Sequence, residues 1–211
     1  MPKAASEILC SNLTQGLHAA AQPLAILRAG LSKDHIDRMR TDELRELAAN
    51  SAREVERVCA LFSCLQQLVM TETIKPDLSA TPVLPLLAHV ADEVNLLFEE
   101  DGMCLNATVP DTCQPVLINS ARTLQALTSV LLIVHAVSRA EDTIELIVSL
   151  SASAVQVVVR NANPYVGTMN TEASLRMALA DANIRSQQGK FSWSAAPFSV
   201  QIELPKAPLA Q

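Results

Sequence analysis

LTQGLHAAAQPLAILRAGL, residues 13–31, decides how the first part of this 211-residue chain is organised. Its apolar residues recur at intervals of three, four or seven, which predicts an amphipathic helix. His18 lies at the edge of the apolar stripe, and the alanines at 19–21 give it little steric cover. Pro23 lacks an N–H and its ring disturbs the carbonyl of Ala19, so we expect a kink beside the histidine. The stripe comprises Leu13, Leu17, Ala21, Leu24 and Leu31.

A second helix is expected from about Asp42 to Thr71, with Thr41 as its N-cap residue. Its apolar positions alternate in steps of three and four, which is typical of a coiled-coil seam. Two such helices form a hairpin that cannot bury both apolar faces alone, so we expect two hairpins to pair into a dimeric four-helix bundle. A charge in the seam, as in Val58→Glu, should weaken this homodimer. The seam contains Leu44, Leu47, Ser51, Val55, Val58, Phe62, Leu65 and Val69.

The periodicity changes after Lys75, where Pro82 and Pro85 mark a linker or a helix entry. The order helix, strand, helix, strand, strand, helix, strand, strand predicts an α+β fold with helices on one face of a sheet. The expected domains are the helical hairpin, 1–74, and an α/β sandwich, 75–211. Helices are expected at about 85–101, 121–137 and 175–187, strands at 103–109, 144–150, 155–160, 191–194 and 198–204, and an apolar fragment at 115–118.

Charge and cysteine content restrict the partners and the compartment. A formal net charge of −6 without a Lys/Arg cluster argues against nucleic acid as a partner. Five cysteines without metal-ligand spacing indicate reduced residues of a cytosolic protein. The N-terminus has no signal-peptide pattern, and polar residues interrupt the longest apolar run, Leu124–Val137. We therefore expect a cytoplasmic protein that contacts no membrane.

The order His18-Ala-Ala-Ala-Gln22-Pro23-Leu24 resembles the phospho-acceptor box of bacterial histidine kinases, although that family has an acidic residue where this chain has Ala19. The second half is similar in layout to the ATP-binding domain that follows these helices in the family. The resemblance implies that His18 is the phospho-acceptor. It also implies that a receiver domain docks beside His18, on Ala19, Ala21, Gln22 and Pro23.

The nucleotide motifs of that family are missing. Leu131 and His135 stand where the family has two asparagines facing Mg²⁺, and a leucine cannot ligate a hard cation. Residues 161–165, NANPY, replace the family's Asp-x-Gly-x-Gly, so the adenine-binding carboxylate is an amide, Asn161, and both glycines carry side chains. Only Gly167 lies between Tyr165 and Leu175, too little for a loop that wraps a triphosphate. We expect a degenerate ATPase-like domain that binds neither ATP nor another cofactor.

His135 has two interpretations. On an apolar helix it is expected to be a partly buried histidine with one hydrogen-bond partner, and a new ligand or base is the less favoured alternative.

Transfer from a phosphorylated receiver requires less of the protein than autokinase activity. The incoming group is an acyl phosphate on the receiver's aspartate, and the receiver brings the Mg²⁺. The resemblance therefore implies a histidine phosphotransfer protein of a two-component phosphorelay, which passes phosphoryl groups between receiver-domain aspartates through His18. The alternative is a pseudo-histidine-kinase scaffold that binds response regulators or kinases without phosphotransfer. Expected partners are a second copy of the chain and response-regulator receiver domains, with a hybrid histidine kinase as a further candidate.

Overall fold

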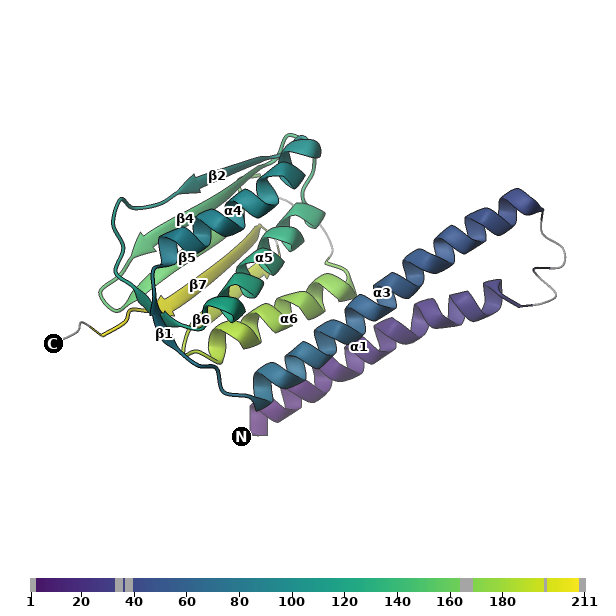
Figure 1. Cartoon of the computed structure of the whole chain (residues 1–211), viewed down its shortest axis with the longest axis horizontal. Coiled ribbons are helices and arrows are strands. Elements are labelled where there is room, and N and C mark those ends of the chain that lie inside the picture. The colour runs from purple at the N-terminus through teal and green to yellow at the C-terminus, as the bar shows by residue number, and fades with distance from the viewer. Residues whose placement is uncertain (1–2, 33–35, 37–39, 164–168, 196, 209–211) are drawn as a thin grey trace. The chain divides into compact units, whose positions relative to one another are not determined.

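The computed structural model describes residues 3–32, 36, 40–163, 169–195 and 197–208. The chain divides into two compact units, Met1–Val69 and Met70–Gln211. Figure 1 shows the first as a helical hairpin and the second as helices packed on a sheet.

The hairpin consists of α1 (Lys3–Gly30) and α3 (Thr41–Thr73). Helix α1 continues through Pro23 without a break in its helical residues. The expected N-cap of α3, Thr41, is wrong, because Thr41 is already helical. Arg40 precedes the helix, its C=O accepts from Leu44 N–H at 3.0 Å, and its own N–H donates to the Glu43 carboxylate at 2.8 Å. A carboxylate in the first turn thus replaces the expected hydroxyl cap.

The two helices pack through stripes that agree with the predicted ones in part: Leu13 on α1 and Leu44, Leu47, Ser51, Val58 and Leu65 on α3 are shared, and the other positions differ. At Gly16 a Cβ atom would lie 2.6 Å from Leu65 Cδ2, so the glycine permits a close approach of the helices. The facing stripes follow the a and d positions of a heptad. On α1 this inner stripe is Leu13, Gly16, Ala20, Pro23, Leu27 and Gly30, and on α3 it is Leu44, Leu47, Ser51, Glu54, Val58, Leu61, Leu65 and Leu68, all buried or partly buried.

Three leucines of the predicted apolar stripe, Leu17, Leu24 and Leu31, belong to a second apolar stripe that is exposed. This stripe lies one residue after the inner stripe, at the heptad e position of both helices. In an antiparallel pair the e positions lie on the same flank, so the second apolar stripe is continuous across the hairpin. It consists of Leu17 and Leu24 on α1, Leu31 directly after α1, and Val55, Phe62 and Val69 on α3, each 36–52% exposed.

The last turn of α3 belongs to the second unit. Thr71 Oγ1 donates to Asn183 Oδ1 at 3.0 Å in a buried position. The guanidinium of Arg122 donates to the carbonyls of Ile74, at 2.8 Å, and Thr71, at 3.4 Å. A cation at the C-terminal end of a helix satisfies carbonyls that have no partner within the helix. These contacts fix the point where α3 ends.

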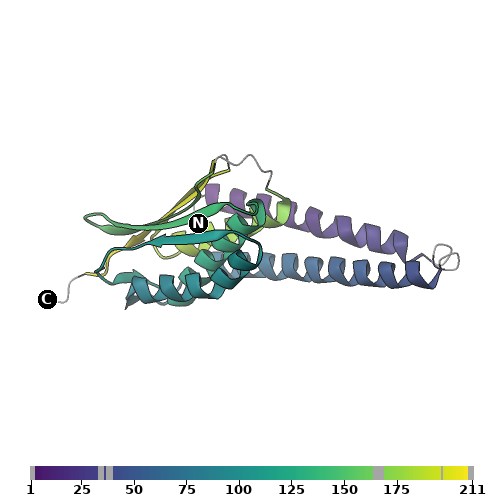
Figure 2. The ribbon, with the colours of Figure 1, turned by 90° about the horizontal axis from the view of Figure 1, so that it is seen from above.

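A five-stranded sheet in the order β2-β4-β5-β7-β6 forms the second unit, with α4 (Val83–Glu100), α5 (Ser120–Val137) and α6 (Thr171–Arg185) on one face (Figures 1 and 2). Only β2 and β4 pair in parallel. The helix-facing residues of β5 and β7 are fully buried valines, isoleucine and leucine, as the alternating pattern predicts. The strands are β2 (Cys104–Thr108), β4 (Thr143–Leu150), β5 (Ala154–Asn161), β6 (Lys190–Ala195) and β7 (Phe198–Pro205).

A small second sheet pairs β1 (Ser79–Thr81) with β3 (Val116–Ile118) in antiparallel register. The expected linker at this point therefore contains a strand, and the apolar fragment at 115–118 is its partner. Helix α6 begins four residues earlier than expected because the side chain of Asn170 caps it, accepting from Ala173 N–H at 2.8 Å.

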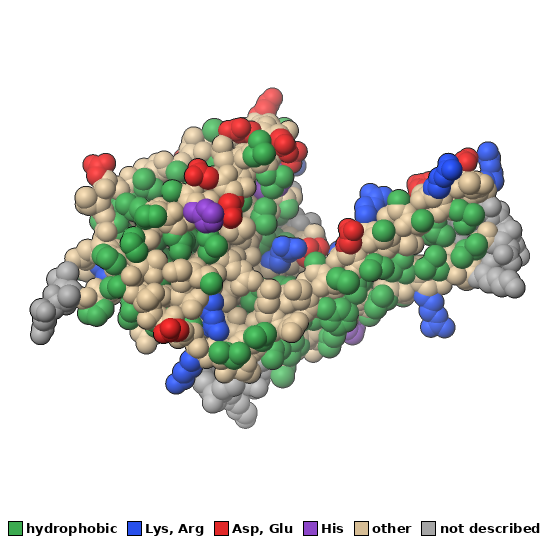
Figure 3. Space-filling model, in the orientation of Figure 1, with side chains coloured by type: hydrophobic (Ala, Val, Ile, Leu, Met, Phe, Trp, Pro, Cys, Tyr) green, Lys and Arg blue, Asp and Glu red, His purple; other side chains and the backbone are tan. Residues whose placement is uncertain are grey.

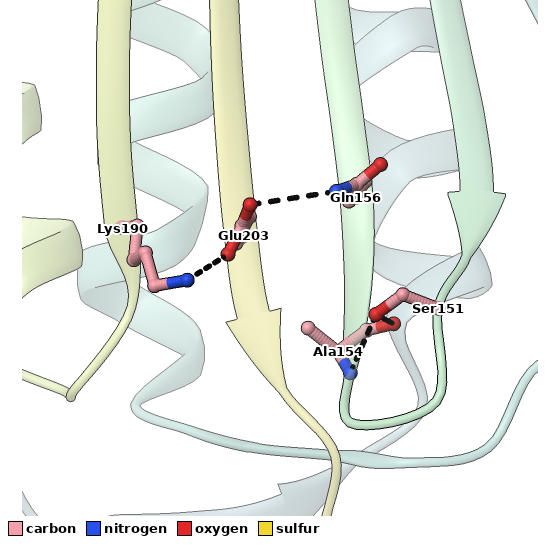
Figure 4. A network of polar contacts seen from close by, with 5 residues as sticks. All are labelled: Ser151, Ala154, Gln156, Lys190 and Glu203. Atoms are coloured by element: carbon pink, nitrogen blue, oxygen red, sulfur yellow. Dashed lines mark hydrogen bonds and ion pairs between the residues drawn. The ribbon is translucent and has the colours of Figure 1, made fainter.

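The other face of the large sheet is polar. Lys190 Nζ donates to Glu203 Oε2 at 2.7 Å, and Gln156 Nε2 donates to Glu203 Oε1 at 3.4 Å, in a row across β6, β7 and β5 (Figure 4). The hydrogen bond from Lys190 lowers the pKa of Glu203. In the β4–β5 turn, the Ser151 hydroxyl accepts from Ala154 N–H at 3.1 Å. Such a row is typical of a solvated sheet face.

Helix α5 corrects the expectation that no apolar run is long enough to span a membrane. It is the one helix within the described ranges that is long and apolar enough to do so. Seven of its residues are nevertheless buried in this unit. The core helix of a globular domain meets the same criteria, so the length and composition of α5 are explained by its packing.

Candidate functional site

His18 lies on the outer side of α1 and is exposed. It follows Gly16 by two residues, and Gly16 faces α3, so the imidazole is directed away from the partner helix. Ala21 and Gln22, one turn further along, are exposed on the same side, and Ala19 is partly buried at its edge. The structure therefore brings His18, Ala21 and Gln22 together on one surface.

Pro23 does not belong to that surface. Its side chain is buried in the inner stripe of α1, as is that of Ala20, which is 1% exposed. The expectation that Pro23 contributes to a docking surface is therefore wrong. The physical reason is the heptad position: Pro23 follows Gly16 by seven residues and so faces α3 as Gly16 does.

Leu131 and His135 both point into the second unit. Leu131 is a core residue, 1% exposed. The His135 ring packs edge-on against Phe98, with centroids 5.0 Å apart and planes at 71°. Its Nε2 lies 2.9 Å from Asp101 Oδ2, an ion-pair distance for a protonated ring, without the alignment of a hydrogen bond. His135 is thus partly buried, as expected, but its neighbour is a carboxylate in place of a hydrogen-bond partner.

Asn161 and Asn163 are bound to a buried carboxylate. Asn161 Nδ2 donates to Asp142 Oδ2 at 2.8 Å, and Asn163 Nδ2 donates to Asp142 Oδ1 at 2.7 Å. Asn161 Oδ1 accepts a hydrogen bond from Asn163 N–H at 2.8 Å, and Asn161 Nδ2 also donates to Ser138 Oγ at 3.0 Å. Both ends of the Asn161 amide are therefore used within the protein. We name Asp142, Asn161 and Asn163 the carboxylate–amide cluster.

The charge of Asp142 is stabilised within this cluster. Burial alone would raise the pKa of its carboxyl, but hydrogen bonds from the Arg139 backbone N–H and from the amides of Asn163 and Asn161 outweigh burial and lower that pKa. Sequence reasoning missed Asp142, because its partners lie 19 and 21 positions away. An acidic residue placed directly before a strand of buried apolar residues was the available signal.

A cavity of about 220 Å³ lies between α5 and the first turns of α6. Ligand sites usually enclose roughly 300–1,000 Å³. The charge at its rim is paired, since Arg176 donates to Glu172 at 3.0 Å. Gly167, the one glycine between Tyr165 and Leu175, lies outside the described residues, as does Tyr165. Apolar side chains from α5 supply one wall, and the lining is Leu132, Ile133, Ala136, Asn170, Glu172, Ala173 and Arg176.

These side chains do not fit a magnesium nucleotide. Leu131 offers no oxygen, and the Asn161 amide is already hydrogen-bonded at both ends. Two hollows of about 460 and 480 Å³ lie elsewhere, along the sheet, and each contains an ion pair, Lys190–Glu203 or Arg160–Glu145. Among the described residues no group of three or more His, Cys, Asp and Glu side chains could hold a metal ion.

A helical hairpin with an exposed histidine, followed by an α+β sandwich, defines a histidine-kinase-like fold. Solved structures agree. Acinetobacter baumannii histidine kinase AdeS has a TM-score of 0.70 at 17% identity, covering 90% of this chain and 98% of its own. Histidine kinase ThkA, in complex with response regulator protein TrrA, has a TM-score of 0.75 at 13% identity, covering 99% of this chain and 65% of its own.

A histidine kinase from Burkholderia phymatum STM815 has a TM-score of 0.56 at 14% identity, covering 92% of this chain and 98% of its own. No protein-family model and no curated protein matches the sequence. The likeness therefore concerns the fold.

Proposed function

We propose that this chain is a histidine phosphotransfer protein of a two-component phosphorelay, which passes phosphoryl groups between receiver-domain aspartates through His18 without binding ATP. The observation that carries the proposal is the exposed imidazole of His18 on the outer side of the hairpin, among small uncharged side chains, in a histidine-kinase-like fold. Its neighbours Ala21 and Gln22 leave room for another protein to approach the ring.

The transfer reaction requires one nucleophilic nitrogen atom from this chain. A nitrogen lone pair of the neutral imidazole forms a bond to the phosphorus atom of the receiver's acyl phosphate. The bond between this phosphorus and the aspartate oxygen of the receiver breaks at the same time. The aspartate leaves as a carboxylate, and the other ring nitrogen keeps its proton. The receiver brings the Mg²⁺ that neutralises the phosphoryl oxygens. The reverse step delivers the group to the next receiver, such as that of a response regulator or of a hybrid histidine kinase.

The absence of ATP binding is supported by three features of the second unit. Leu131 is buried in the core, where it cannot offer oxygen to a metal. Asn161 is held in the carboxylate–amide cluster. The cavity between α5 and α6, about 220 Å³, is smaller than usual ligand sites. This domain acts as a degenerate ATPase-like module.

A second copy of the chain covers the second apolar stripe. The six side chains of this stripe are uncharged, repeat every seven residues, and lie on one flank of the hairpin. Two copies related by a two-fold axis pack this flank of one hairpin against the same flank of the other, and the two hairpins together form a four-helix bundle. The protein works in the cytoplasm, in keeping with its five free cysteines.

Transfer from a phosphorylated receiver tests the proposal. The protein is incubated with purified receiver domains carrying labelled acyl phosphate, and acid-labile phosphate on His18 is then sought. His18→Gln keeps a polar side chain of similar reach but removes the nucleophile, so labelling should vanish. His89→Gln is the matched control, because His89 is an exposed histidine on α4.

Each result has a consequence. Labelling of His18→Gln would place the acceptor elsewhere. Receiver binding without any labelling of the unaltered protein would favour the scaffold alternative. Calorimetry with Mg-ATP should show no binding, and micromolar affinity would overturn the part of the proposal that concerns ATP.

A further inference from the structure

The hairpin carries no charge along the part that holds His18. Residues 8–27 of α1 and 58–71 of α3 contain no Asp, Glu, Lys or Arg. The contact of Gly16 with Leu65 places these segments alongside each other. On the side that Figure 3 shows, red and blue side chains gather on the hairpin toward the C-terminal end of α1 and the N-terminal end of α3, and the remaining part is mostly green and tan.

An uncharged outer surface is unusual for a helix. The outward side of a surface helix normally carries charged residues, which keep it solvated. Here that side is built from small or neutral side chains over roughly 17 Å of helix. Its centre, formed by His18 and Gln22 at the heptad f and c positions, lies away from the second apolar stripe at the e positions, so a second copy on that stripe leaves the centre open. We call this outward side the neutral face, and it comprises Thr14, Gln15, His18, Ala21, Gln22 and Ala25, all exposed.

We infer that the neutral face recognises its receiver through apolar and uncharged polar contacts, with no contribution from ion pairs. The inference rests on the proposed function and specifies the partner: a receiver domain whose docking surface around the phosphorylated aspartate is itself apolar or neutral. Opposite charges across an interface speed association and select partners, and salt screens them. A surface without charge has none of these effects, so complementary shape around His18 decides which receiver binds.

The first test is the salt dependence of binding. Purified receiver domains from the same organism are titrated, unphosphorylated, into the full-length His18→Gln protein at 50 and 500 mM NaCl, so that binding is measured apart from transfer. The dissociation constant of the receiver that binds should change less than threefold. A larger change would overturn the inference, because it would reveal ion pairs in the interface.

The second test adds one charge at two places on α1. Gln22→Glu puts a carboxylate in the neutral face on the side away from the second apolar stripe, and receiver affinity should fall at least tenfold. Ala29→Glu is the matched control, an exposed alanine on the same helix beyond Arg28, and it should change affinity less than twofold. Circular dichroism shows whether both variants keep their helices. Equal affinities of the two variants would overturn the inference.

The two proposals fail in different ways. Salt-independent binding without labelling of His18 would remove phosphotransfer and leave the neutral face as a docking surface. Labelling of His18 together with salt-dependent binding would support phosphotransfer and overturn the inference that the neutral face binds without ion pairs. If no receiver domain bound, both proposals would be wrong.

Discussion

Phe62→Glu should separate the two copies of this protein while leaving each hairpin folded. Phe62 belongs to the second apolar stripe and is 47% exposed in one chain. A phenylalanine side chain buries roughly 150–250 Å² in full, so about 100 Å² is left for the second copy to cover. At about 25 cal/mol per Å² this is worth about 2.5 kcal/mol per copy, or about 5 kcal/mol for the symmetric pair. The dimer dissociation constant should therefore rise more than about a thousandfold.

Sedimentation velocity at micromolar concentration, with circular dichroism beside it, measures this effect. Ser63→Glu is the matched control, because Ser63 is exposed outside the second apolar stripe and receives the same charge. Val58→Glu should behave differently, because Val58 is 6% exposed within the hairpin and its substitution should also reduce helicity. A dimeric Phe62→Glu protein, or an unaltered protein that sediments as a monomer, would refute the reasoning.

Three further predictions concern stability. Ser51→Ala should raise the free energy of unfolding by about 1 kcal/mol, because Ser51 Oγ is buried without a hydrogen-bond partner among the described residues. Thermal unfolding measures this gain. In the control variant Ser63→Ala, the free energy of unfolding should rise only by the smaller amount that comes from helix propensity. Gly189→Ala should lower the free energy of unfolding by about 2–3 kcal/mol, because the added Cβ would lie 2.8 Å from Glu203 O and 2.9 Å from Ile184 O, which are backbone atoms that cannot move aside. Urea unfolding should show a far smaller loss for Gly30→Ala, where the added Cβ would meet only the end of the Leu47 side chain. The folded pKa of Asp142 is lowered, so its stabilisation is present at neutral pH and is lost as pH falls below about 4; Asp142→Asn should be less stable at pH 7 but lose less on acidification, and parallel pH profiles of the two proteins would contradict this.

The sequence was sufficient for the fold class, but it left the hairpin contacts ambiguous. Each heptad has three apolar positions, and the hydrophobic pattern does not say which two face the other helix. The leucines at 17, 24 and 31 have the stronger apolar signal, yet Gly16 and Pro23 occupy the inner stripe because small side chains permit close packing. Strand β1 was missed for another reason: Ser79–Thr81 has no alternating pattern, and it exists because β3 pairs with it.

The candidate site was predicted in part. The position of His18 beside small alanines indicated an open side of α1, and the structure places the imidazole there. The orientation of Pro23 depends on the helix packing that the sequence left open. The partners of His135 and Asn161, which are Asp101 and Asp142, come together only in the folded unit, and no local spacing connects them.

The carboxylate–amide cluster also restricts which amino-acid changes natural variation can accept at position 161. An aspartate there, with Asp142 retained, would set two carboxylates about as far apart as the present 2.8 Å amide contact. One of them would have to bind a proton or move away, and either change costs stability. Positions 142 and 161 are therefore epistatic: a carboxylate at 161 becomes tolerable only after 142 has become neutral. Among homologues of this chain, the two positions should covary.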